Sequence, residues 1–215
     1  MISYFPTCCL WCESTHDILD DWQICRRCHE DVFVNSFINS VNKIPFYAES
    51  FSSRYLFNGS LREMIIKWKY NPSPEYTRPL GMAALTSWGM ESINFDYIIP
   101  VPPHIERLKE RKIHQTLLLA KWIGNWFGVP IFYDIYRTKR TPSQTALTRS
   151  ERVENLLNSF AVEKSRMLNH KSILLMDDIM TTGATLRNLI SVVRRANPRA
   201  IHVRTIAYNQ IRKSL

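Results

Sequence analysis

The sequence has no long hydrophobic run, no internal repeat and no low-complexity segment. The apolar stretches 98–103 and 117–123 are too short to span a bilayer, and Lys121 interrupts the second. The first residues, MISYFPTCC, lack the basic region and apolar stretch of a secretory signal, so we expect a cytoplasmic protein. Because 45% of the 215 residues are apolar, the chain can bury a core, and intrinsic disorder is excluded.

Acidic residues are also in deficit, and the net charge of +9 is unevenly distributed. Residues 1–50 contain seven acids and three bases, a balance of −4, whereas residues 51–215 contain twelve acids and twenty-five bases, a balance of +13. A strongly basic protein surface, as residues 51–215 would form, attracts polyanions such as phosphates and nucleic acid. A solvated basic surface has the same composition, so charge alone leaves both interpretations open.

Apolar strands alternate with helical stretches along most of the chain, which predicts an α/β fold with a parallel sheet covered by helices. Residues 42–53 are expected to be a linker. Ser60 and Glu63 have capping-box spacing at the start of a helix whose buried face would carry Leu61, Met64, Ile65 and Trp68. Further helices are expected at 79–90, 116–127, 148–158 and 185–196, and strands at 97–101, 131–135, 172–176 and 201–207.

Two C-x2-C knuckles, Cys9-Leu-Trp-Cys12 and Cys25-Arg-Arg-Cys28, lie near the N-terminus with twelve residues between them. Four thiolates on two knuckles favour a closed, tetrahedral structural zinc site formed by Cys9, Cys12, Cys25 and Cys28. Cys8 is left over, although it could replace Cys9 as a ligand. Disulfides and an iron–sulfur cluster are the alternatives that the spacing leaves open.

The stretch LLMDDIMTTGAT combines features that neither a buried strand nor a solvated turn requires. Asp177 and Asp178 follow an apolar strand, at the sheet edge where open α/β sheets bind ligands. Gly183 permits a tight loop before a helix, and amides at a helix N-terminus bind anions. The carboxylates and the loop suit a ligand with hydroxyls and a phosphate, such as a ribose 5-phosphate. A plain strand–turn–helix with capping Asp and Thr is the alternative.

The string DDIMTTGAT resembles the binding motif for 5-phosphoribosyl-1-pyrophosphate (PRPP) in type I phosphoribosyltransferases. The resemblance implies a Rossmann-like parallel sheet with a hood, and Mg-PRPP as ligand. It also implies that Asp177 and Asp178 lie at the ribose. The 5-phosphate would then be held by Thr181, Thr182, Gly183, Ala184 and Thr185.

Over nearly its full length the chain resembles the ComF family of competence proteins. The shared features are the cysteine knuckles, SLREMIIKWKY, IIPVPPHIERLKERKIHQTLLLA, RTKRTPSQTALTRSERVENLLNSF and the PRPP-type loop. The resemblance implies a zinc module at 1–45, a phosphoribosyltransferase-like domain at 46–215, and a role in natural transformation. The implied partners are incoming single-stranded DNA and, in some members, a DNA-translocating helicase. One departure is RKIHQ at 111–115, where family members usually have RGFNQ, so the geometry of that loop is in question.

Two further segments correspond to loops of the phosphoribosyltransferase fold. The pyrophosphate loop would comprise Val101, Pro102, Pro103 and His104, unless these residues are a plain strand exit. Residues 137–152 would form a flexible loop that closes over PRPP, unless they are a solvated linker. The basic residues that would contact pyrophosphate or DNA phosphate are Arg107, Lys109, Arg111, Arg137, Lys139, Arg140, Arg149 and Arg152.

Two functions are compatible with these features. An enzyme would transfer ribose 5-phosphate from PRPP to an acceptor, but we identify no segment of the sequence that would recognise the acceptor. A binding module would instead keep the site as a phosphate pocket or sensor and hold single-stranded DNA on its basic face. Tyr70, beside Lys67 and Lys69, is then a candidate for stacking on bases, whereas the spacing of Trp68 predicts a core position.

Overall fold

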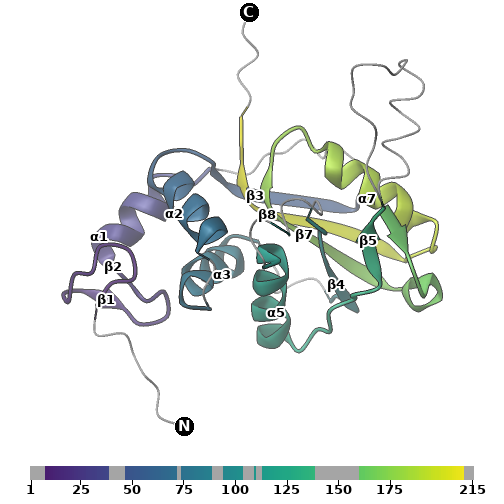
Figure 1. Cartoon of the computed structure of the whole chain (residues 1–215), viewed down its shortest axis with the longest axis horizontal. Coiled ribbons are helices and arrows are strands. Elements are labelled where there is room, and N and C mark those ends of the chain that lie inside the picture. The colour runs from purple at the N-terminus through teal and green to yellow at the C-terminus, as the bar shows by residue number, and fades with distance from the viewer. Residues whose placement is uncertain are drawn as a thin grey trace, which may run out of the picture.

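A four-stranded parallel sheet forms the centre of the protein in a computed structural model that describes residues 8–38, 47–71, 74–88, 94–103, 109, 113–138 and 160–210 (Figure 1). The strands are β3 (Ser50–Leu56), β4 (Tyr97–Pro100), β7 (Ser172–Met180) and β8 (Ala200–Tyr208), in the order β3-β8-β7-β4. Each neighbouring pair runs parallel. The predicted α/β fold is therefore confirmed.

The central strands are apolar on both faces because helices cover both faces of the sheet. On one face Leu174 and Met176 pack in a cluster with helices α2 (Gly59–Tyr70), α3 (Pro74–Trp88) and α5 (Gln115–Phe127). On the other face Ile173 and Leu175 pack with helix α7 (Ala184–Arg194) and its neighbours. This layering leaves the carboxyl ends of the strands as the free edge at which a ligand site can form.

Helix α2 has the predicted buried face, since Leu61, Met64, Ile65 and Trp68 are each at most 1% exposed. The predicted capping box is wrong. Asn58 is the N-cap residue and makes no side-chain cap, and Ser60 lies inside the helix, where its hydroxyl donates to Asp31 Oδ2 at 2.5 Å. The start of α2 is therefore held by the preceding segment rather than by its own side chains.

One other predicted helix boundary shifts. Helix α3 begins five residues before the expected start at 79 and contains Pro79 in its second turn, where proline has no N–H to donate to the carbonyl four residues earlier. Gly81 of α3 lies against α5, and a Cβ there would approach the ring of Trp122 to 2.4 Å. The absence of a side chain at Gly81 thus allows the two helices to pack closely. The helix expected at 148–158 lies outside the described residues.

Two strand predictions are corrected. Residues 50–53, expected in a linker, begin β3, which pairs in parallel with β8 from Ser50↔His202 to Leu56↔Tyr208. In the expected strand 131–135, Ile131 forms only an isolated bridge to Ile98. The regular strand is β5 (Ile135–Arg137), and it pairs antiparallel with β6 (Phe160–Val162). A 3-10 helix, η3 (Ser165–Leu168), precedes β7.

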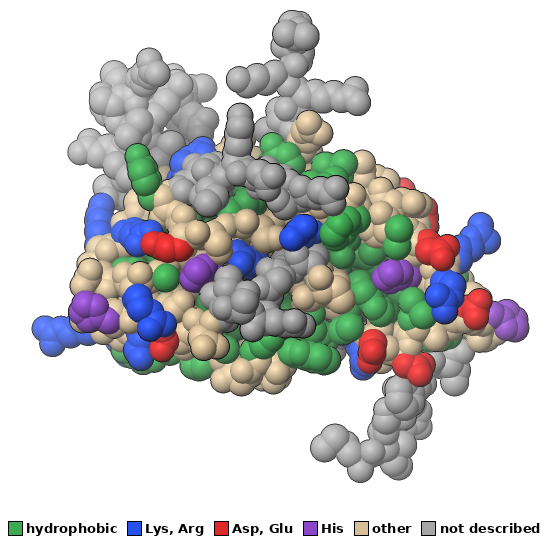
Figure 2. Space-filling view, turned by 180° about the vertical axis from the view of Figure 1, so that it is seen from behind, with side chains coloured by type: hydrophobic (Ala, Val, Ile, Leu, Met, Phe, Trp, Pro, Cys, Tyr) green, Lys and Arg blue, Asp and Glu red, His purple; other side chains and the backbone are tan. Residues whose placement is uncertain are grey.

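The N-terminal segment contains a short antiparallel pair, β1 (Ile18–Leu19) and β2 (Ile24–Cys25), then α1 (Arg26–His29) and a π-helix, η1 (Glu30–Val34). Phe33 and Val32 join the same hydrophobic cluster as the buried residues of α2. The domain boundary at 45/46 stays a prediction, although no separate core marks it within the described residues. Figure 2 shows that most acidic side chains of the visible face lie at this end, whereas Lys and Arg are spread over the rest.

Candidate functional site

The two predicted acids lie at the carboxyl edge of the sheet. β7 continues to Met180, beyond the expected end at residue 176, because it keeps pairing with β8. On its other side pairing ends at Met176↔Pro100, where β4 stops. Asp177 and Asp178 therefore lie just past the end of β4, as expected for a ligand site at this edge.

The main chain around the acids is held by the carboxylates themselves. The backbone N–H of Asp178 donates to Asp177 Oδ1 at 2.9 Å, and the N–H of Ile179 donates to Asp178 Oδ1 at 2.7 Å. Burial and the neighbouring Asp178 carboxylate raise the pKa of Asp177 to about 8, against smaller opposing effects of Lys69 and Arg137. Asp177 therefore largely keeps its proton at neutral pH, so burial and the neighbouring carboxylate do not leave it ionised.

Lys69, at the end of α2, forms an ion pair with Asp178. Its Nζ lies 2.8 Å from Asp178 Oδ2, and the two side chains are only 15% and 14% exposed. The main-chain carbonyl of Lys69 accepts a hydrogen bond from Gln115 Nε2 at 2.8 Å, which ties α2 to the start of α5. Sequence reasoning named Lys69 only as a neighbour of Tyr70, because nothing in the local sequence reveals a contact with a residue more than one hundred positions away.

The loop after β7 has the backbone expected of an anion site. Gly183 has φ of 73° and is the N-cap residue of α7, so a left-handed turn leads directly into the helix. Thr181 and Thr182 are exposed, and Thr182 Oγ1 accepts a weak hydrogen bond from the N–H of Ala184 at 3.4 Å. Free amides at a helix N-terminus together with exposed hydroxyls form a donor set for phosphate oxygens.

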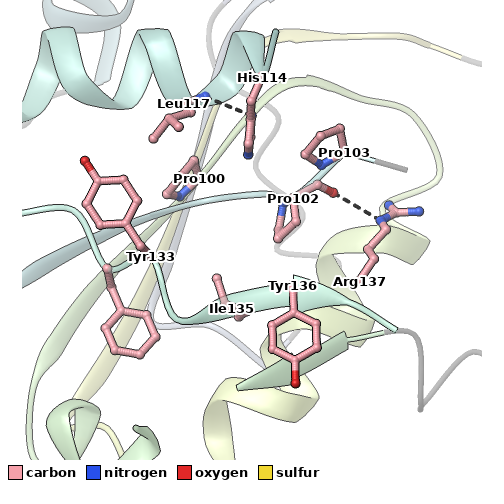
Figure 3. A pocket seen from close by; sticks show the side chains of 10 residues that line it. Pro100, Pro102, Pro103, His114, Leu117, Tyr133, Ile135, Tyr136 and Arg137 are labelled. Carbon is pink, nitrogen blue, oxygen red and sulfur yellow. Dashed lines mark hydrogen bonds between the residues drawn. The ribbon is translucent and has the colours of Figure 1, made fainter. Parts of the chain in front are cut away.

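An apolar cavity of about 230 Å³ lies beside β4 and β5, and it includes part of the expected pyrophosphate loop (Figure 3). Its polar groups are His114 and Arg137, and Arg137 Nε donates to the carbonyl of Pro102 at 3.1 Å. The guanidinium also lies 5.0 Å from the centre of the Phe160 ring. The remaining lining residues are Pro100, Pro102, Pro103, Leu117, Phe132, Tyr133, Ile135 and Tyr136.

His114 is neutral at physiological pH. Burial lowers its pKa to about 4, despite the opposing charge of Asp178. Its Nδ1 accepts a hydrogen bond from the N–H of Leu117 at 3.1 Å and so caps α5, which leaves Nε2 to carry the ring proton. Sequence reasoning noted His114 only as a departure from the family string RGFNQ and gave it no role.

Most of the predicted basic contacts cannot be placed. Lys109 is described and exposed, and Arg137 lies in the cavity wall at the end of β5. The antiparallel pair β5–β6 brackets the expected flexible loop, most of which lies between residues 139 and 159 and so outside the described residues. Also outside the described residues are His104, Arg107, Arg111, Lys139, Arg140, Arg149 and Arg152.

The four predicted cysteines converge. The sulfurs of Cys9, Cys12, Cys25 and Cys28 all lie within 4.8 Å of one another, and Cys8 is not a member of this cluster. The Sγ atoms of Cys12 and Cys25 are 3.7 Å apart, close to the spacing of about 3.8 Å in a tetrahedral site with Zn–S bonds of about 2.3 Å. The N–H groups of Trp11 and Cys12 point at Cys9 Sγ, at 3.4 and 3.5 Å. The cluster thus fits a metal ion.

Comparison with known families agrees with this geometry. The model of the phosphoribosyl transferase domain matches residues 112–214. The match covers slightly less than half of the chain. The match includes the acids, the loop at 181–185 and the cavity residues from His114 onward, whereas Lys69 and the cysteines lie before it.

The chain is also a relative of Competence protein F from Haemophilus influenzae, with 32% identity over 108 residues, or 49% of this chain and 47% of that protein. It is 28% identical over 109 residues to the DNA utilization protein YhgH of Escherichia coli, covering 50% of this chain and 47% of that protein. The chain therefore spans about half the length of the curated relatives it matches.

Two solved structures align with part of this chain. A glutamine PRPP amidotransferase from B. subtilis aligns with 65% of this chain and 30% of its own, at 16% identity and a TM-score of 0.45. An adenine phosphoribosyltransferase aligns with 64% of this chain and 74% of its own, at 14% identity and a TM-score of 0.42. None of the helices that the structure describes has the length and apolar character needed to cross a membrane.

Proposed function

We propose that this protein is a ComF-type competence protein that acts in DNA uptake in the cytoplasm and binds Mg-PRPP at the carboxyl end of β7. The observation that carries the proposal is the juxtaposition of Asp177 and Asp178 with the left-handed turn at Gly183. The acids would bond the ribose hydroxyls and the loop at 181–185 would hold the 5-phosphate. Kinship with Competence protein F supports the cellular role.

Lys69 would be part of this binding step. In the structure its ammonium pairs with Asp178 Oδ2. A ribose hydroxyl would need the same oxygen as a hydrogen-bond acceptor. Binding of the sugar therefore requires Lys69 to share or leave this carboxylate. Because the released ammonium would then stand beside the pyrophosphate group of the same ligand, the exchange replaces one ion pair with another.

Calorimetric titration of Mg-PRPP into the metal-loaded protein tests the proposal. Wild type should bind, and the double variant Asp177→Asn, Asp178→Asn should lose at least tenfold in affinity. Asp134→Asn is the matched control, because its carboxylate pairs with Lys164 away from the acid pair and is more exposed. Absence of binding to wild type would overturn the proposal, as would equal affinity in wild type and the double variant.

We also propose that single-stranded DNA binds the basic surface. The balance of +13 over residues 51–215 supports it, and Tyr70 remains an exposed aromatic at 73%. Of its neighbours, Lys67 lies over the rings of Trp11 and Tyr76, and Lys69 pairs with Asp178. Affinity for oligo-dT should fall steeply as salt rises, whereas salt-independent or absent binding would contradict this part of the proposal.

The four cysteines would hold structural Zn²⁺. Thiolates on two knuckles complete a tetrahedral shell and leave no position for a substrate, so the metal would supply folding energy rather than chemistry. Residues 1–45 would form this module and residues 46–215 the phosphoribosyltransferase-like domain. Reduced thiols of this kind fit the proposed cytoplasmic location.

The apolar cavity favours a second candidate function, phosphoribosyl transfer to an acceptor. Departure of pyrophosphate breaks the C1–O bond and builds positive charge on the ribose, which ionised Asp178 would stabilise. Arg137, which supplies a fixed positive charge in the cavity wall, would attract the leaving group. Release of pyrophosphate in a broad acceptor screen tests this function, and turnover lost in Arg137→Met would assign the cavity to it. No turnover with any acceptor would refute it.

A further inference from the structure

The face of the sheet over β3 and β8 contains two arginines in an unusual environment. Arg204 of β8 is opposite Ser52 in the strand register and is only 3% exposed. Arg54 lies two residues further along β3, on the same side, and is half-buried. The positive charge of Arg54 opposes that of Arg204 and, together with burial, lowers the pKa of Arg204 to about 10. Arg204 nevertheless remains protonated at neutral pH.

Their hydrogen-bonding capacity is largely unused. Arg204 Nη1 donates to Ser50 Oγ and to the carbonyl of Val203, both at 2.9 Å. On this face the buried polar atoms without a partner are Arg54 Nε, Arg204 Nε and Ser52 Oγ, whereas Ser53 Oγ is a fourth on the opposite face of β3. Since most buried polar groups in proteins are satisfied, three such atoms on one face of two adjacent strands require an explanation.

No acid compensates the two charges among the described residues. Glu49, which precedes β3, accepts hydrogen bonds from Arg194 Nη2 at 2.7 Å and from the N–H of Ile201 at 2.6 Å. Neither Arg54 nor Arg204 forms an ion pair within the part of the chain that the structure describes. A buried guanidinium without a counter-charge is costly, so an anion bound here would be stabilised strongly.

The rim of this cluster is accessible. Ser50 and His202 are half-buried, and Ser50 Oγ lies 2.8 Å from His202 Nδ1. The bonds from Arg204 to Ser50 direct its guanidinium towards the amino end of β3, away from the carboxyl edge that holds Asp177. The cluster is therefore a separate place on the molecule from the phosphoribosyl site.

We propose that Arg54, Arg204 and Ser50 form a second anion site that binds a phosphate group. Guanidinium groups only donate hydrogen bonds, a serine hydroxyl can donate as well as accept, and a phosphate offers enough oxygens to accept from several donors at once. The phosphate can belong to a free nucleotide or inorganic phosphate, or to the backbone of a single-stranded nucleic acid. Its binding does not depend on PRPP.

Thermal unfolding of the metal-loaded full chain, in phosphate and in chloride at equal ionic strength, tests the site. Phosphate should raise the melting temperature of wild type by several degrees more than chloride does, because a ligand that binds only the folded state stabilises it. Arg204→Met should melt in chloride at or above the wild-type temperature and lose the phosphate-specific rise. The exposed Arg166→Met is the control and should keep it.

Arg54→Met provides a second variant at a half-buried position, in case Arg204→Met does not fold. It should also lose the phosphate-specific rise, with at least a tenfold loss of phosphate affinity. All variants keep the loop at 181–185, so a rise that persists in Arg204→Met or Arg54→Met belongs to that loop and overturns the proposal. No rise in wild type overturns it too. Displacement of phosphate by oligo-dT would identify nucleic acid as the source, and its failure would identify a free phosphate.

Discussion

Replacing Asp177 with asparagine should remove one loss of stability that rising pH causes between pH 5 and pH 8. Burial and the Asp178 carboxylate raise the pKa of Asp177 to about 8 in the folded protein, whereas an unfolded aspartate has a pKa of about 3.9. Between these values the folded state keeps a proton that the unfolded chain has released. The stabilisation that this retained proton gives the folded protein is complete at pH values below the pKa of Asp177 in the unfolded chain. It is lost as pH rises through the pKa of Asp177 in the folded protein.

The magnitude follows from linkage. One such proton changes the free energy of unfolding by up to about 1.4 kcal/mol per pH unit, so the Asp177 carboxyl alone should remove about 3 kcal/mol of stability from wild type between pH 5 and pH 7. Asp177→Asn lacks this contribution, because an amide does not ionise. The opposite contribution of His114, whose pKa burial lowers to about 4, is common to both proteins and cancels in the difference between their slopes. Urea unfolding at a series of pH values measures both slopes.

Asp96→Asn is the control for this experiment. The N–H of Ser172 and the ammonium of Lys171 lower the pKa of Asp96, so this residue titrates below the window and its variant should keep the wild-type slope. Equal slopes in wild type and Asp177→Asn would refute the reasoning, because they would show that Asp177 is ionised in the folded protein at pH 5.

Lys69→Met should lower the free energy of unfolding by about 3 kcal/mol at pH 7, because it leaves the nearly buried Asp178 carboxylate without its cation. Lys164→Met removes the cation of a far more exposed pair and should cost less than about 1 kcal/mol. Equal losses of the two variants in urea unfolding would contradict this reasoning. Gly81→Ala should cost about 1–3 kcal/mol, since its Cβ would meet the Trp122 ring at 2.4 Å, and an unchanged midpoint would count against the α3–α5 packing. Chelation of the metal should lower the melting temperature and zinc should restore it; protein isolated without metal and insensitive to chelators would argue against the site.

The candidate site at the carboxyl edge of the sheet could be predicted from sequence because its parts are contiguous. An apolar run, two acids, a glycine and a helix follow one another within about twenty residues, and local rules suffice to place them. The convergence of the four cysteines was predictable for the same reason, since knuckle spacing is a local property. The structure extends β7 by four residues only because β8 continues to pair with it.

What sequence reasoning missed depends on distant contacts. The string SFSSRYL has too few apolar residues to predict a buried strand, and it becomes β3 because β8, about 150 residues later, supplies its pairing partner. The capping box failed because Asp31 attracts the Ser60 hydroxyl. Tertiary contacts bring Lys69 and His114 to the site, and these contacts cannot be predicted from the spacing of residues in the sequence.

Helix α2 has a consequence for how such proteins can be recombined. Its first turn is tied to the cysteine segment through Ser60 and Asp31, and its last turn reaches the acid pair through Lys69, about 14 Å away along the axis. A chimera joined at residue 45 would take Asp31 and Ser60 from different parents. The hydrogen bond between them would be lost, and the helix that carries Lys69 to the acid pair would no longer be held at its start. Chimeras between related proteins should therefore take the cysteine segment and α2 from the same parent.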